Sequence, residues 1–71
     1  MSMLKVIEVL AESPDGFDAA TATAVTTAAE TVRNIKSVYI KDMNAEVVDG
    51  KITKYRVNAK ISFVVDGQSA T

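Results

Sequence analysis

A strict alternation of apolar and polar residues near the end of the chain constrains its fold more than any other feature. The apolar positions are Tyr55, Val57, Ala59, Ile61 and Phe63, and the polar positions between them are Arg56, Asn58, Lys60 and Ser62. Because the side chains of a strand alternate between its two faces, this pattern predicts one long strand with an apolar face and a hydrogen-bonding face. The hydrogen-bonding face is open to solvent, to another copy of the chain or to a ligand.

A first strand and a helix are predicted ahead of this segment. Residues Met3 to Ala11 are rich in Val, Ile and Leu, which favours a strand. Ser13, Pro14 and Asp15 then indicate a helix start, since serine suits the N-cap, proline the first helical position and an acidic residue the positive helix end. We expect the helix to run from about Pro14 to about Arg33.

The predicted helix is built from very small side chains. Between Asp18 and Thr31, eleven of fourteen residues are Ala or Thr. Such residues bring a helix close to whatever it packs on, which suits either a close interface between subunits or a helix that simply covers a sheet. At three- and four-residue spacings, the inward-facing positions are expected to be Phe17, Ala20, Ala24, Ala28, Val32 and Val25.

A second strand, from about Ser37 to about Val48, changes phase half-way along. The apolar residues of its first half are Val38 and Ile40, and those of its second half are Met43, Ala45 and Val47. A slip of one residue turns every later side chain to the opposite face, so we expect a β-bulge near Lys41 and Asp42. The pair Asp49-Gly50 then predicts a tight turn into the third strand, which ends at Val65.

Together these elements predict an α+β fold with the order β-α-β-β. We expect a single domain over residues 1–71, with a core over residues 3–65 and a polar tail over residues 66–71. Strands of a dozen residues span roughly 40 Å, whereas the helix spans about 30 Å. One helix therefore covers only part of one face of the sheet. A chain of this size also buries only about 60% of its unfolded surface, so burial between subunits is expected.

Composition excludes several classes of function. The 71 residues include no cysteine and no histidine, which removes disulfides, thiolate or imidazole metal sites and the common nucleophile–histidine catalytic pairs. The 8 basic residues are balanced by 9 acidic ones, so the basic excess of a nucleic-acid-binding module is absent. No apolar run is long enough to span a bilayer and no signal-peptide pattern is present. We expect a cytoplasmic protein that is not an enzyme and has no nucleic-acid or membrane partner.

Several segments of the chain resemble the dodecin family. They are Lys5–Val9, Ser13–Ala20, Thr31–Ile35 and Asp49–Val57, the last continuing to Phe63. The resemblance covers about Leu4 to Val65, with a similar order and length of elements. It implies a subunit in which a three-stranded antiparallel sheet partly wraps one helix, assembled as a hollow homododecamer of tetrahedral symmetry.

The resemblance also implies a function. Dodecins are typically non-enzymatic flavin-binding proteins that store or sequester flavin, and some members bind coenzyme A. Pairs of flavins stack at a two-fold axis between a tryptophan from each subunit, and a glutamine of the last strand hydrogen-bonds the ring edge. FMN or riboflavin is therefore the cofactor that the resemblance predicts, with self-association and a small-molecule ligand as the partners.

The chain departs from the family pattern at the ligand site. The stacking tryptophan falls at Ser37 and the glutamine at Arg56, a cation that suits an anionic group. Tyr39, two residues along the same strand, is a substitute stacking surface. The predicted ligand-binding residues are therefore Ser37, Tyr39, Arg56 and Asn58.

A second hypothesis follows from the same departures. It is a structural or cation-binding shell without bound flavin, since one dodecin-like group is described as calcium-binding. Asp15 and Asp42 match acidic positions that in some dodecins face cation-lined openings of the shell. They are the predicted metal ligands under this alternative.

Overall fold

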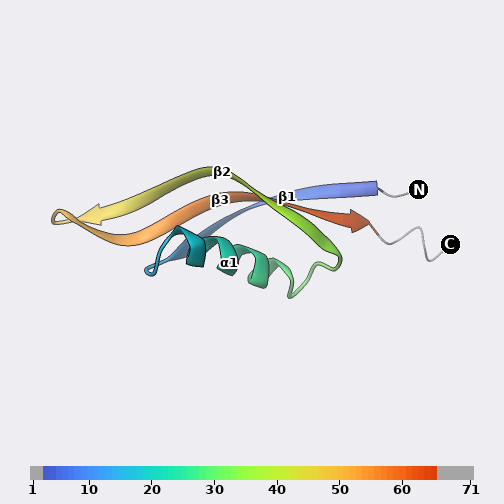
Figure 1. Cartoon of the computed structure of the whole chain (residues 1–71), viewed down its shortest axis with the longest axis horizontal. Coiled ribbons are helices and arrows are strands. Elements are labelled where there is room, and N and C mark those ends of the chain that lie inside the picture. Colours follow the sequence, from blue (N-terminus) through green and yellow to red (C-terminus); the bar gives the residue numbers. More distant parts are fainter. Residues whose placement is uncertain (1–2, 66–71) are drawn as a thin grey trace.

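The computed structural model describes residues 3–65 of the chain, and Figure 1 shows its four elements. They are β1 (Met3–Ser13), α1 (Phe17–Ala28), β2 (Ile35–Val48) and β3 (Lys51–Val65). The strands form one antiparallel sheet in the order β1-β3-β2, so the last strand lies in the middle. This is the predicted α+β fold with the predicted β-α-β-β order. The predicted polar tail, residues 66–71, lies outside the described residues.

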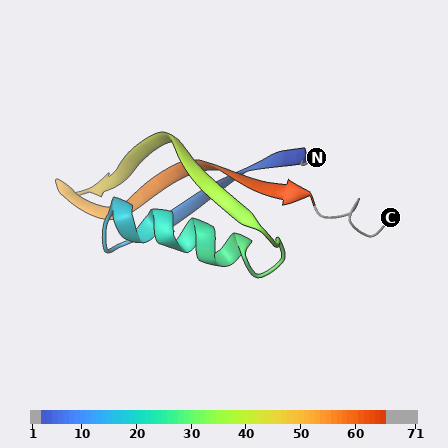
Figure 2. The ribbon, with the colours of Figure 1, turned by 45° about the vertical axis from the view of Figure 1, so that its right-hand side comes forward.

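The alternation along β3 sets the two faces of the sheet. Val57, Ala59 and Ile61 are fully buried on the side where α1 crosses the sheet, which we call the inner face (Figure 2). The residues between them point to the opposite side, the outer face, because strand side chains alternate. The register carries this division to the neighbouring strands, since Ile61 lies between Ile7 of β1 and Val38 of β2. The apolar and polar faces of β3 are therefore as predicted.

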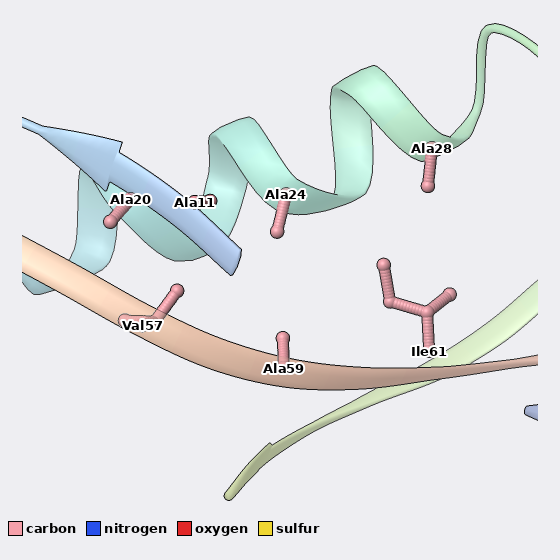
Figure 3. Packing of buried hydrophobic residues seen from close by; sticks show 7 residues of the cluster. All are labelled: Ala11, Ala20, Ala24, Ala28, Val57, Ala59 and Ile61. Atoms are coloured by element: carbon pink, nitrogen blue, oxygen red, sulfur yellow. The ribbon is translucent and has the colours of Figure 1, made fainter. Parts of the chain in front are cut away.

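The core between α1 and the sheet is small and consists mainly of alanine. Its seven buried hydrophobic residues are Ala11, Ala20, Ala24, Ala28, Val57, Ala59 and Ile61. In Figure 3, Ala24 of the helix points at Ala59 of β3, and Ala28 lies above Ile61. Side chains this short let the helix lie close to the sheet, but they bury little apolar area. The expectation for Ala20, Ala24 and Ala28 is confirmed.

Larger residues flank this core. Phe17 is half-buried and packs edge-to-face on Tyr55, with ring centroids 5.0 Å apart. Val25 is also half-buried, while Val32 lies beyond the end of the helix. The predicted inward stripe is therefore correct for the helix itself, and wrong in placing Val32 on it.

The helix begins later than predicted. Ser13 is the last residue of β1, and its Oγ accepts a hydrogen bond from the backbone N–H of Asp15, at 3.0 Å. It therefore closes a local turn of the kind that serine favours, and does not cap the helix. The N-cap is Gly16, whose φ of 136° is outside the range that other residues readily adopt. The chain turns from the strand into α1 at this glycine. Pro14 and Asp15 therefore lie in the turn before the helix.

The helix also ends earlier than predicted, at Ala28. The next residues form tighter bonds of the i→i+3 type, from the N–H of Glu30 to Thr27 and from the N–H of Thr31 to Ala28, each 3.1 Å. Asn34, with a φ of 63°, then completes the change of direction. Strand β2 accordingly begins at Ile35, two residues before the predicted Ser37.

The phase change predicted in β2 is a β-bulge. The register with β3 shifts between Ile40 and Asp42, so Lys41 is the extra residue, as expected. Two more shifts occur, between Ile35 and Ser37 and between Glu46 and Val47, and neither was predicted. The predicted turn is present between β2 and β3 at Asp49 and Gly50, with φ values of 54° and 76°.

The molecule is long and thin, with extents of 56 × 19 × 13 Å. Its radius of gyration is 14.7 Å, against about 11 Å for a compact domain of this length. Both ends of the sheet extend beyond α1 (Figure 1). Because Ser13 pairs with Tyr55, residues 51–54 of β3 have no partner in β1. We call residues 46–54 the hairpin arm; its exposed large apolar residues are Val47, Val48 and Ile52.

Candidate functional site

The outer face carries all four residues predicted to bind a ligand. Ser37 and Tyr39 come from β2, while Arg56 and Asn58 come from the central strand β3. Each faces a neighbour across the β2–β3 ladder; the pairs are Ser37 with Ser62, Tyr39 with Lys60, Asp42 with Asn58 and Asn44 with Arg56. The helix of the described residues, α1, lies on the opposite, inner side of the sheet (Figure 2).

These residues do not meet at one point within a single chain. Ser37 lies opposite Ser62, and Ser62 is six positions from Arg56 along β3. At about 3.3 Å per residue, the two ends of the predicted site are roughly 20 Å apart. The outer face therefore has an Arg56 end and a Tyr39 end, with Asn58 between them.

The Arg56 end is a network of opposite charges. The Nε of Arg56 donates to Glu12 Oε2 at 2.7 Å, and its Nη1 donates to Asn44 Oδ1 at 3.4 Å. Its Nη2 is 4.0 Å from Glu46 Oε2, while the Nζ of Lys54 is 3.8 Å from Glu12 Oε1. The hydrogen bond from Arg56 is the main cause that lowers the pKa of Glu12. Arg56 is thus already engaged by acceptors of its own chain.

Asn58 links this network to Glu8 of β1. A hydrogen bond from the Asn58 side chain and the nearby Lys41 ammonium, 3.3 Å from Glu8 Oε2, lower the pKa of Glu8. The Oδ1 of Asn58 is buried, and within the part of the chain that the structure describes it has no hydrogen-bond partner. Among the described residues, the side-chain amide of Asn58 therefore donates a hydrogen bond to Glu8 but accepts none.

The Tyr39 end is more open. Tyr39 is 64% exposed, and Lys60 faces it across the ladder. The hydroxyls of Ser37 and Ser62 are hydrogen-bonded to each other. On the β1 side, Val6 pairs with Ser62 and is 57% exposed. This end combines an exposed aromatic ring with hydroxyl groups and one ammonium.

The two predicted metal ligands lie in different parts of the molecule. Asp15 is in the turn between β1 and α1, and Asp42 is on the outer face opposite Asn58. Over residues 3–65 no group of three or more acidic, histidine or cysteine side chains is arranged to hold a metal ion. A cation at either aspartate would need oxygens from outside the described part of one chain.

Glu12 was missed from the sequence, and Lys60 was placed on this face but was not included among the predicted ligand-binding residues. The spacing of charged residues along the sequence could have indicated their roles. Glu8 and Glu12 are four apart on β1, and their register partners Lys60 and Arg56 are four apart on β3. Opposite charges favour facing positions on antiparallel strands, so this spacing indicates both the register and the partners.

A groove of about 770 Å³ runs between β1 and α1. Its walls are mainly apolar residues of β1 and threonines and alanines of α1, and Glu12 and Arg56 also line it. Since β1 is an edge strand, this groove lies beside unpaired backbone groups of the sheet. The helix of residues 3–65 has neither the length nor the apolar character that crossing a bilayer requires.

Comparisons with known proteins agree on one family. The model of the Dodecin family matches residues 3–66. The dodecin of Streptomyces coelicolor is 31% identical, with a TM-score of 0.87, over 90% of this chain and 91% of that one. Dodecin from Streptomyces davaonensis is 25% identical, with a TM-score of 0.88, over 92% and 96% of the two chains.

A further solved structure is a calcium-chelating immunodominant antigen of Mycobacterium tuberculosis, called calcium dodecin and described as having a novel calcium-binding site. It is 33% identical, with a TM-score of 0.77, over 87% of this chain and 89% of that one. The comparison with curated protein sequences gave no match.

Proposed function

The chain belongs to the dodecin family, and from this premise we propose that it is a non-enzymatic, homododecameric protein that binds and stores a small planar ligand, flavin (FMN or riboflavin) in the first place. The observation that carries the ligand proposal is the exposed ring of Tyr39 among hydrogen-bonding side chains on an uncovered sheet face. An aromatic ring in that setting can stack on a planar ligand while its neighbours bind the ligand's polar edge.

The shape of the subunit supports self-assembly. A core of five alanines, one valine and one isoleucine is little for 71 residues. The hairpin arm exposes large apolar side chains, and the groove between β1 and α1 offers an apolar surface of another part of the chain. Packing of sister copies would bury both surfaces.

Assembly also fits the separation of the two ends of the site. A single small ligand cannot reach Ser37 and Arg56 of the same chain, because they are roughly 20 Å apart. A neighbouring copy can instead supply the contacts that the Tyr39 end of one chain lacks. The ligand site we propose is therefore shared between copies.

Flavin titration tests this function. Riboflavin or FMN added to the purified protein should lose fluorescence on binding. Tyr39→Ala should weaken the affinity for riboflavin by about tenfold, since stacking contributes about 1–3 kcal/mol per ring, whereas Tyr39→Phe should retain the affinity for riboflavin. Unquenched fluorescence with both flavins would contradict the proposal.

The alternative function is calcium binding, which the 33% identity to calcium dodecin favours. Asp15 and Asp42 would then serve with oxygens from neighbouring copies. A ligand that binds only the folded state raises the melting temperature, so calcium should raise it and a chelator should reverse the rise. Asp42→Asn and Asp15→Asn should each reduce the shift. A melting temperature that calcium leaves unchanged would exclude this alternative.

A further inference from the structure

The three cations that β3 places on the outer face differ in what they contact. Lys54 and Arg56 form ion pairs with Glu12, and Arg56 also approaches Glu46. Lys60 forms no ion pair within 4.0 Å among the described residues. The central strand therefore carries two engaged cations at one end of the outer face and a free one at the other.

The residue that should pair with Lys60 is occupied elsewhere. Glu8 is directly opposite Lys60 in the β1–β3 register. Its carboxylate instead contacts the ammonium of Lys41 at 3.3 Å and the side-chain amide of Asn58. Lys60 exerts only a minor effect on Glu8. The ammonium of Lys60 is therefore available to a group from outside the chain.

Hydroxyl groups lie near this lysine on the β2 side of the same face and along β3. Tyr39 is its register partner on β2, and Ser62 is two positions along β3. Ser62 is hydrogen-bonded to Ser37, so one hydroxyl hydrogen of that pair is committed and the other is free to donate. One ammonium and several hydroxyl donors are the groups that bind a phosphate or a carboxylate.

We propose that Lys60, with the hydroxyls of Ser37, Tyr39 and Ser62, forms a subsite for the anionic group of the ligand, a phosphate or a carboxylate. Glu12 keeps Arg56 from this role, because an anion placed at Arg56 would meet the carboxylates of Glu12 and Glu46. The inference rests on the proposed function in assigning this group to a planar ligand, but the anion subsite itself is testable without flavin.

Two variants, each of which removes one positive charge, test the two ends of the outer face separately. Lys60→Gln and Arg56→Gln each remove one cation from the same face of the same strand, four residues apart. With inorganic phosphate as the probe, the melting temperature of the native chain and of Arg56→Gln should rise. Lys60→Gln should not respond. Should Arg56→Gln fail to fold, the double variant Glu12→Gln/Arg56→Gln removes the charge pair together and makes the same comparison.

Flavins then identify the source of the anion. FMN and riboflavin differ by a phosphate group, so FMN should bind about five- to tenfold more tightly, and Lys60→Gln should abolish that difference. Ser62→Ala should reduce it in part. Glu12→Gln, which frees Arg56, should add a second phosphate response that Lys60→Gln does not remove.

The outcomes are distinct. If Lys60→Gln still responds to phosphate and Arg56→Gln does not, the subsite proposal is wrong. If the native chain ignores phosphate and binds both flavins equally, it is also wrong, although the proposed function stands. If phosphate responses follow Lys60 but neither flavin binds, the anion subsite is correct and the flavin-binding function is not.

Discussion

The two faces of β3 show how one strand can divide folding from binding. On the inner face, Val57, Ala59 and Ile61 are fully buried under α1, and their contacts lie within the chain. On the outer face, the neighbouring residues Arg56, Asn58 and Lys60 form polar contacts or none. The inner residues therefore determine whether the chain folds, whereas the outer ones are free to determine what it binds.

This division has an energetic basis. Burial of apolar area is the larger stabilising term, at about 25 cal/mol per Å². Exposed ion pairs such as that between Arg56 and Glu12 contribute far less, because water screens the attraction between their charges. Substitutions that change charge on the outer face should therefore cost little stability. Substitutions that change side-chain volume on the inner face should cost more.

The hairpin arm gives the largest expected effect, because there the sheet extends beyond α1. Val47 and Ile52 are register partners on the arm and are 60% and 51% exposed. If sister copies cover them, Ile52→Glu buries a charge at the interface and should convert the proposed dodecamer into smaller species. Light scattering measures this. Lys51→Glu, one residue away on an exposed side chain, should keep the full mass, and a dodecameric Ile52→Glu protein would contradict the role of the arm.

The inner face should respond next most strongly. Ile61 has no exposed surface and is one of the two largest fully buried side chains. Ile61→Ala should cost about 2–4 kcal/mol through lost burial and the cavity left behind. Chemical denaturation at fixed protein concentration measures the loss. Ser62→Ala, on the outer face, should change stability by less than about 1 kcal/mol, and equal losses from the two variants would contradict the difference between the faces.

The helix contact tests the same face from the opposite side. Ala24 is 3% exposed and points at Ala59, so Ala24→Leu should overfill the contact and cost about 1–3 kcal/mol. Ala22→Leu, on an exposed position of the same helix, is the matched control and should leave the denaturation midpoint nearly unchanged. If both variants are as stable as the native chain, the alanine contact does not limit how closely α1 approaches the sheet.

Most of the inner face could be predicted from the sequence. The two-residue period of β3 and the spacing of Ala20, Ala24 and Ala28 each identify a buried side without any tertiary information. The helix limits could not, because Gly16 and Ser13 act through backbone geometry at the turn. Serine is a residue type that favours the N-cap position, but Ser13 is still part of β1.

The candidate site was less predictable. Its four predicted ligand-binding residues were assigned to the correct face, because alternate residues of a strand point to opposite faces. Their separation of roughly 20 Å depends on the strand register, and the bulges of β2 shift that register at three places. The pairing of Arg56 with Glu12 also needed the register, since the two residues are 44 positions apart in sequence.

The smallest expected effect is the pH dependence of the outer face. Hydrogen bonds lower the pKa of Glu8 and of Glu12 below the ordinary value of 4.5. The unfolded chain therefore binds more protons than the folded one as the pH falls below that value. The stability that these carboxylates contribute is present above about pH 4.5 and is lost as the pH falls through their lowered pKa values.

A denaturation series from pH 7 to pH 3 measures this contribution. Glu12→Gln should be slightly less stable than the native chain at pH 7, and the gap should close as the pH falls below 4.5. Glu30→Gln, which removes an exposed carboxylate from the turn after α1, is the charge-matched control and should leave the native profile unchanged. A gap that stays constant over the whole series would mean that Glu12 acts through packing and that its charge on the outer face does not matter.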